Sequence, residues 1–218
     1  MKSYQTILFD LDGTLTDPGI GITNSVAYAL QKYGIETADR QQLFPFIGPP
    51  LLDSFQERYG FSEQQAKEAV QFYREYYRAH GIFENRVYDG IEALLSALQR
   101  AGKTVLVATS KPEPFAEQIL SHFGLRSYFA FVAGSKLDET RTKKAEVIAY
   151  ALSSAHISDR SAAVMVGDRK YDILGARENG LDSIGVLYGY GSREELLQVQ
   201  ATCIAEAPDM LSHFLLAD

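Results

Sequence analysis

The sequence predicts an α/β protein: a Rossmann-like, doubly wound parallel sheet core with an inserted all-helical cap domain. The first observation behind this prediction is that short apolar runs alternate with helical patterns, as in parallel sheets covered on both faces. The second is one long stretch that holds three helical patterns and no good strand, at residues 20–33, 49–59 and 62–80. We therefore expect a core of residues 1–15 and 84–218 and a cap domain of residues 16–83.

The expected strands are apolar runs without polar alternation, at residues 4–9, 103–108, 128–133, 162–166 and 183–187. Helices between them predict right-handed crossovers. Capping-box spacing marks two helix starts, Asp89 with Glu92 and Ser62 with Gln65. Pro112 suits the first turn of another helix, because that position needs no backbone N–H.

Composition excludes several classes of protein. The chain has 218 residues, of which 46% are hydrophobic and 22% charged, as in globular domains. Cys203 is the single cysteine and cannot form an internal disulfide, so we expect a reducing, cytoplasmic compartment. No run of 18 apolar residues and no signal peptide is recognisable, which predicts no membrane role. The formal net charge of −7 gives no attraction to a nucleic acid polymer.

The run Asp10-Leu11-Asp12-Gly13-Thr14 comes directly after the first expected strand. Residues two apart in extended geometry face the same way, so both carboxylates can point into one cleft. Gly13 permits a close backbone turn and could offer its N–H to an anion. Taken alone, an Asp-rich turn is an equally good interpretation.

Two further segments carry polar side chains at strand ends. Thr109 and Ser110 follow the second strand and precede a helix start, where a hydroxyl and free N–H groups can bind phosphate. Asp168 follows the fourth strand, and Asp172 lies in the first turn of the next helix. Each could be a simple helix cap. Because all lie at carboxyl ends of parallel strands, where open α/β sheets bind ligands, one shared site is the better interpretation.

Four carboxylates in one cleft cannot all ionise without a cation. Hard oxygen ligands without His or Cys favour Mg²⁺ over zinc. A lysine would complete a phosphate site. Lys144 lies on the helical stripe of Ile148 and Ala151 and should point inward, whereas Lys143 should lean outward and is the second choice.

These motifs in this order resemble the haloacid dehalogenase-like hydrolase superfamily, in its phosphoglycolate phosphatase-type branch with a helical cap. The tail segment at residues 188–196 is also similar to that branch. Two features depart from its commonest form: Arg169 stands where Ser or Thr is usual, and Lys144 is followed by Ala145-Glu146-Val147 rather than a Pro-x-Pro turn. Together with residues 46–51, these departures resemble a 5′-nucleotidase-like subgroup.

The resemblance implies a Mg²⁺-dependent phosphomonoester hydrolase that acts through an aspartyl-phosphate intermediate. It assigns Asp10 as the nucleophile and Asp12 as the acid and base. It implies metal binding by Asp10, by Asp12 through its backbone carbonyl and by Asp168, while Asp172 holds a metal-bound water or orients Lys144. The implied phosphate ligands are Thr109, Ser110, Gly13 and Lys144, with Lys111 and Arg169 as further cations near the cleft mouth.

The implied partner is a small phosphorylated metabolite, phosphoglycolate or a nucleoside 5′-monophosphate, and we expect a monomer or weak dimer. Phe46 and Gly48 lie in the cap loop that is the candidate substrate contact. A cap aromatic ring could stack on a nucleobase, although a small helical core is the favoured interpretation of the aromatics there. A phosphosugar mutase of the same superfamily and a non-catalytic phosphate-binding module are the alternatives.

Overall fold

The computed structural model describes residues 2–138 and 140–216. The chain divides into two compact units, one of Met1–Thr16 with Val87–Asp218 and one of Asp17–Arg86. Met1, Glu139, Ala217 and Asp218, which belong to the expected core, lie outside the described residues. The functional assignment of residues 16–83 as a cap stays a prediction.

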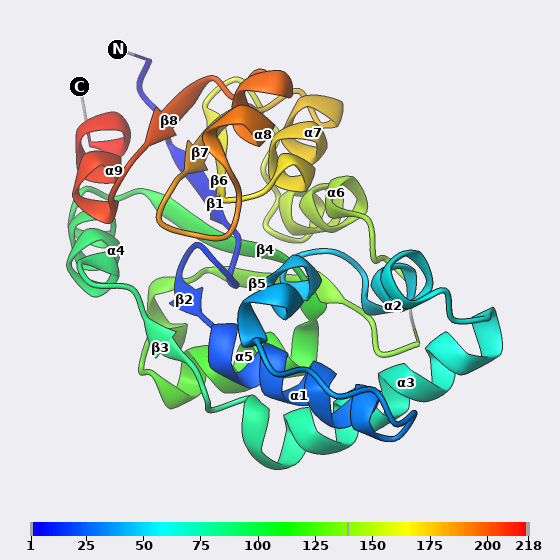
Figure 1. Ribbon diagram of the computed structural model, residues 1–218. Helices are drawn as coiled ribbons and strands as arrows, with labels where there is room; N and C mark the ends of the chain where they lie inside the picture. Colours follow the sequence, from blue (N-terminus) through cyan, green and yellow to red (C-terminus); the bar gives the residue numbers. More distant parts are fainter. Residues whose placement is uncertain (1, 139, 217–218) are drawn as a thin grey trace. The chain divides into compact units, whose positions relative to one another are not determined.

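The larger unit is built on a parallel sheet of six strands in the order β5-β4-β1-β6-β7-β8 (Figure 1). The predicted fold class is confirmed, since each apolar run forms a strand at or within a few residues of its expected place. All four residues of β1 are buried, as expected for a strand covered on both faces. The strands are β1 (Thr6–Phe9), β4 (Thr104–Pro112), β5 (Phe131–Ser135), β6 (Ala163–Gly167), β7 (Asp182–Val186) and β8 (Cys203–Ala205).

Helices cover this sheet on both faces. α6 packs on β4 and β5 and against α7, whereas α4 packs against α9. A buried cluster that includes Leu8, Leu106, Ile148 and Met165 fills the space between the sheet and α6. The helices of this unit are α4 (Ile91–Arg100), α5 (Glu113–His122), α6 (Lys144–Ser154), α7 (Lys170–Glu178), α8 (Arg193–Gln198) and α9 (Pro208–Leu215).

Strand order makes the carboxyl end of β1 the expected place for a ligand site. The chain runs from β1 to β4 and β5 on one side, then returns to β6, β7 and β8 on the other. β1 therefore lies at the point where the winding direction reverses, which is where open α/β sheets bind ligands. A separate two-stranded sheet pairs β2 (Thr16–Asp17) with β3 (Arg86–Val87).

The smaller unit is helical. Its elements are α1 (Gly19–Gln31), a 3-10 helix (Arg40–Phe46), α2 (Leu51–Tyr59), α3 (Glu63–Tyr76) and a π-helical turn (Tyr77–Gly81). The predicted capping box opens α3: Gln65 N–H donates to Ser62 Oγ at 3.3 Å, and Ser62 N–H donates to Gln65 Oε1 at 3.0 Å. Its core is aromatic, since the Phe55 ring lies 5.0 Å from Phe46 and 5.9 Å from Phe61.

Three local predictions are wrong. The Asp89–Glu92 capping box does not form, because Gly90 is the N-cap of α4 in a left-handed conformation with φ of 87°. β5 begins at Phe131 rather than at residue 128, because Arg126–Tyr128 form a 3-10 turn. β4 continues to Pro112 through a register shift after Ala108, so the strand extends beyond the predicted run.

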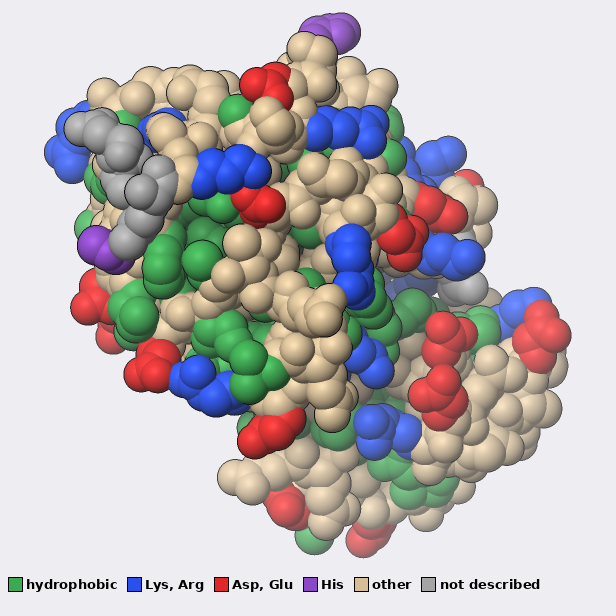
Figure 2. All heavy atoms as spheres, turned by 90° about the horizontal axis from the view of Figure 1, so that it is seen from above, with side chains coloured by type: hydrophobic (Ala, Val, Ile, Leu, Met, Phe, Trp, Pro, Cys, Tyr) green, Lys and Arg blue, Asp and Glu red, His purple; other side chains and the backbone are tan. Residues whose placement is uncertain are grey.

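The surface carries charges of both signs. On the face drawn in Figure 2, Lys and Arg side chains are interspersed with Asp and Glu side chains. Within the described part of the chain, no helix is long and apolar enough to cross a membrane.

Candidate active site

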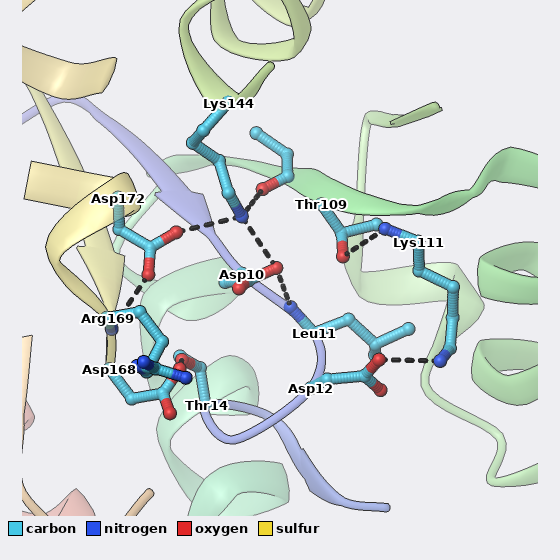
Figure 3. A network of polar contacts seen from close by, with 11 residues as sticks. Asp10, Leu11, Asp12, Thr14, Thr109, Lys111, Lys144, Asp168, Arg169 and Asp172 are labelled. Carbon is cyan, nitrogen blue, oxygen red and sulfur yellow. Dashed lines mark hydrogen bonds and ion pairs between the residues drawn. The ribbon is translucent and has the colours of Figure 1, made fainter. Parts of the chain in front are cut away.

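The site begins where β1 ends. Asp10 follows Phe9, is 5% exposed, and donates its backbone N–H to Val166 O of β6 at 2.9 Å. Its Oδ1 accepts the Leu11 N–H at 2.7 Å (Figure 3). This second contact fixes the rotation of the carboxylate, so the side chain is held in place by its own strand end.

Lys144 is the buried cation of the site. It is the first residue of α6, and its Nζ lies 2.9 Å from Asp10 Oδ1 and 2.8 Å from Asp172 Oδ1 (Figure 3). It also donates to Ala108 O at 3.0 Å. Burial acts to lower the pKa of Lys144, but the Asp10 and Asp172 carboxylates outweigh it and raise the pKa above its ordinary value. Lys143 is exposed, so the structure brings Lys144, not Lys143, to the carboxylates.

Asp168 and Asp172 join Asp10 at this sheet edge. Asp168 follows β6, and Asp172 lies in the first turn of α7, where its Oδ2 accepts the Arg169 N–H at 3.0 Å. One oxygen from each of Asp10, Asp168 and Asp172 can be chosen so that all lie within 4.8 Å of one another. Burial raises the pKa of Asp168 well above its usual range, and the Asp172 and Asp10 carboxylates raise it further.

This acidic cluster suits a divalent cation of the Mg²⁺ type. Its donors are carboxylate oxygens, which hard cations prefer. Burial raises the pKa of Asp172 as well, while Lys144 opposes that shift. Carboxylates whose ionised form is disfavoured by burial and by one another gain most from a bound cation, because the cation restores the charged form.

Asp12 forms a second buried ion pair. Lys111 Nζ lies 2.5 Å from Asp12 Oδ2, and their side chains are 5% and 12% exposed. The expectation of Lys111 as a cation at the cleft mouth is therefore wrong, because its ammonium is buried against Asp12. Asp12 Oδ1 is buried without a hydrogen-bond partner among residues 2–138 and 140–216. Burial raises the pKa of Asp12, Lys111 opposes this shift, and Asp10 adds to it.

Gly13 is needed for space rather than for its N–H. Its φ is +80°, and a Cβ there would overlap the Asp168 carboxylate. Its N–H donates to Thr16 O at 2.8 Å. The prediction that this N–H is offered to an anion is therefore wrong, because the turn after β1 already uses it.

Thr109 and Ser110 lie on β4 rather than in a helical turn. Thr109 is 2% exposed, and its Oγ1 accepts the Lys111 N–H at 3.2 Å. Ser110 is partly exposed. α5 begins only at Glu113, so the expected placement of both residues at a helix N-terminus is wrong. Thr109 still reaches the same sheet edge as Asp10, because β4 pairs directly with β1.

The candidate substrate loop lies in the smaller unit. Phe46 is 2% exposed, and its ring lies 5.0 Å from Phe55 and 6.1 Å from Tyr59. This packing explains Phe46 as part of the helical core and does not support it as a substrate contact. Gly48 is partly exposed, with φ of 104°, in the turn before α2.

Sequence reasoning missed how the segment after β7 meets the acidic cluster. Tyr190 N–H donates to Asp168 Oδ2 at 2.8 Å, and Tyr188 Oη donates to Thr14 O at 3.0 Å. Arg169 was expected near the cleft mouth, but it pairs with Glu195. The signal that could have found this contact is the Gly-x-Gly at residues 189–191, since glycine often marks a close backbone approach.

Known proteins match this chain over most of its length. A family model described as haloacid dehalogenase-like hydrolase matches residues 7–186. A 5′-nucleotidase of Pseudomonas aeruginosa is 52% identical over 199 residues, covering 91% of this chain and 90% of that protein. The tyrosine-protein kinase PtkA of Mycobacterium tuberculosis is 39% identical over 207 residues, covering 94% of this chain and 70% of that protein. The crystal structure of a predicted phosphatase from Clostridium acetobutylicum has a TM-score of 0.95 and 50% identity, covering 99% of both chains.

These matches extend over most of the chain and confirm the resemblance that its motifs predict. The chain belongs to the haloacid dehalogenase-like hydrolase family, and it is a phosphatase of that family.

Proposed function

We propose that this member of the haloacid dehalogenase-like hydrolase family is a Mg²⁺-dependent phosphomonoester hydrolase. It forms an aspartyl phosphate on Asp10 and acts on nucleoside 5′-monophosphates, with phosphoglycolate as the other candidate. The observation that carries the proposal is the buried network in which Lys144 Nζ lies 2.9 Å from Asp10 and 2.8 Å from Asp172. Such a network holds one carboxylate in fixed orientation beside an acidic cluster suited to a cation.

Asp10 is the proposed nucleophile. A carboxylate can attack phosphorus directly and needs no activating base. One Asp10 oxygen attacks phosphorus, and the bond from phosphorus to the ester oxygen breaks. Lys144 holds the carboxylate and offers positive charge where the phosphoryl oxygens arrive. Thr109 and Ser110, on the neighbouring strand, are the proposed hydroxyl and N–H contacts to phosphate.

Asp12 is the proposed acid and base. It gives a proton to the leaving alcohol in the first step, then removes one from the water that attacks the aspartyl phosphate. That second attack breaks the bond between phosphorus and Asp10 and releases inorganic phosphate. Burial raises the pKa of Asp12, which favours the protonated form required in the first step. Its Oδ1 has no hydrogen-bond partner among the described residues, so that atom is available to the leaving group.

Mg²⁺ would be held by Asp10, Asp168 and the backbone carbonyl of Asp12, with Asp172 beside them. It would supply positive charge that stabilises the phosphate group as negative charge develops on it. The choice of a nucleotide substrate is supported by the Pseudomonas aeruginosa relative, whose name is 5′-nucleotidase.

We further propose that the helical unit acts as a cap that excludes water. We also propose that the enzyme is cytoplasmic and that it is a monomer or weak dimer.

Phosphate release from a substrate panel tests this function. The panel contains nucleoside 5′-monophosphates, their 3′ isomers, phosphoglycolate and hexose phosphates, each with Mg²⁺ and with EDTA. We expect Mg²⁺-dependent release with preference for 5′-monophosphates, and no release by Asp10→Asn at unchanged far-UV circular dichroism. Near-full activity of Asp10→Asn would refute the mechanism.

The same mixtures separate the alternatives. Isomerised hexose phosphate without free phosphate would indicate a mutase, and absence of any product would indicate a phosphate-binding module. Because one relative is named a tyrosine-protein kinase, the chain is also incubated with ATP and examined for phosphotyrosine. Phosphotyrosine that survives the Asp10→Asn substitution would place a kinase activity outside the proposed site.

A further inference from the structure

Arg169 binds a glutamate rather than standing free as a phosphate ligand. Its Nε donates to Glu195 Oε1 at 3.0 Å, and its Nη2 donates to Glu195 Oε2 at 3.4 Å. The two side chains are 15% and 21% exposed. A planar guanidinium that meets both oxygens of a carboxylate forms a directional contact, and partial burial makes it less screened than a surface pair. The guanidinium of Arg169 therefore links the start of α7 to Glu195 of α8.

Glu195 also caps the helix that carries Asp172. Its Oε1 accepts the backbone N–H of Lys170, the first residue of α7, at 2.7 Å. The first N–H groups of a helix lack partners within it, so this contact satisfies one of them with a charged acceptor. Glu195 is itself fixed, because its N–H donates to Ser192 Oγ at 3.1 Å. One carboxylate thus ties the start of α8 to the start of α7.

Residues 189–191, just before α8, pack closely against Asp168. Tyr190 N–H donates to Asp168 Oδ2 at 2.8 Å. A Cβ on Gly191 would overlap the Asp168 carbonyl oxygen, and a Cβ on Gly189 would lie 2.5 Å from Asp168 Cβ. Only glycine permits this approach at both positions. The segment therefore contacts the side chain and the backbone of Asp168 together.

We propose that residues 188–195, called here the collar, position Asp168 and Asp172, and that Arg169 and Glu195 are positioning residues rather than substrate ligands. Asp168 is held through Tyr190, and the first turn of α7, which contains Asp172, is held through Glu195. The inference rests on the proposed function in that it takes these two carboxylates to form the cation site. It goes further in assigning a role to a segment that would not touch the substrate.

Mg²⁺ binding to the apo protein, measured by titration calorimetry, tests the collar. The variants are Glu195→Gln, Arg169→Gln and the double variant. Glu206→Gln is the matched control, because Glu206 forms an ion pair with Arg193, the first residue of α8, at 2.6 Å on the exposed surface. Loss of a residue that supports metal ligands costs about 10–100-fold in metal affinity. We expect a loss in that range for Glu195→Gln and none for Glu206→Gln.

The double variant and the kinetics separate positioning from substrate binding. If Arg169 and Glu195 act as a pair, the double variant loses no more affinity than the weaker-binding single variant. We also expect Arg169→Gln to lower kcat at limiting Mg²⁺ with little change in KM for the substrate, and Arg169→Lys to recover part of the loss. A rise in KM at unchanged Mg²⁺ affinity would refute the proposal and make Arg169 a substrate ligand.

Hydrogen exchange of residues 168–172 tests the collar without metal. We expect Glu195→Gln to speed exchange there at least several-fold, while Glu206→Gln leaves it at the wild-type rate. If the wild-type protein binds no Mg²⁺, the proposed cation site is refuted. The exchange rates then still test whether the collar holds residues 168–172 in place. If Glu195→Gln exchanges at the wild-type rate, the proposed positioning role of the collar is refuted, whatever the Mg²⁺ titration shows.

Discussion

Replacing Lys144 with methionine tests the electrostatic basis of the site. The Lys144 side chain is 4% exposed, and its ammonium lies 2.9 Å from Asp10, 2.8 Å from Asp172 and 3.0 Å from the Ala108 carbonyl oxygen. Methionine fills a similar volume but leaves both carboxylates without their common cation. We expect a large loss of stability in the metal-free protein, since the remaining charges are buried close together.

Two estimates of this loss agree. Removing one partner of a buried ion pair destabilises a protein by about 3–5 kcal/mol. Alternatively, Asp10 or Asp172 takes up a proton when Lys144 is absent. Protonating an aspartic acid of ordinary pKa at pH 7.5 costs about 5 kcal/mol of folding free energy. For a chain of this length each kcal/mol lowers Tm by about 2–4 °C, so the expected decrease is about 6–20 °C.

Urea unfolding in EDTA at pH 7.5, followed by far-UV circular dichroism, measures this loss. Lys143→Met is the matched control, because Lys143 is the neighbouring residue and is exposed. It should change stability by less than about 0.5 kcal/mol, as exposed substitutions usually do. It should also keep the phosphatase activity that Lys144→Met loses. Equal unfolding midpoints for the two variants would refute the argument that Lys144 compensates buried charge.

Three further predictions concern local structure. Gly13→Ala should lower Tm and abolish phosphate release, because the added Cβ would overlap the Asp168 carboxylate. Gly34→Ala is the control: Gly34 also has a positive φ, +72°, but open space surrounds it, so this variant should change stability much less. Phe55→Ala should cost about 3–5 kcal/mol in urea unfolding because the ring is fully buried, and the same change at exposed Phe83 should cost far less. Ser62→Ala should cost about 1 kcal/mol through loss of the α3 cap, and an unchanged unfolding midpoint would contradict this.

The fold was predictable where burial decides the pattern. β1 and β6 are buried along their whole length, and apart from Thr6 and Gly167 at their ends their residues are apolar. β8 was missed because it has three residues and lies at the sheet edge, where Cys203 and Ile204 are only half-buried. The Asp89–Glu92 capping box failed because Gly90 takes a left-handed conformation that local spacing does not reveal.

The site was predictable only in part, for a related reason. The inward direction of Lys144 follows from helix periodicity, which a sequence displays directly. The partners of Lys111 and the Gly13 N–H depend on the register shift in β4 and on the turn after β1. Lys111 meets Asp12 99 residues away in the chain, and a contact of that range leaves no periodic signal. The Gly13 contact is local, but the turn geometry that directs its N–H to Thr16 leaves no periodic signal either.

The buried lysine side chains form ion pairs with three of the four carboxylates at the site and not with Asp168, and this difference bears on the role of the collar. Lys144 contacts Asp10 and Asp172, and Lys111 contacts Asp12. Asp168 receives its hydrogen bonds from the Tyr190 amide at 2.8 Å and the Thr14 hydroxyl at 3.5 Å, both uncharged. Burial, together with Asp172 and Asp10, raises the pKa of Asp168 well above its usual range. A cation beside Asp168 would therefore relieve this electrostatic penalty, provided that the collar keeps the carboxylate in place.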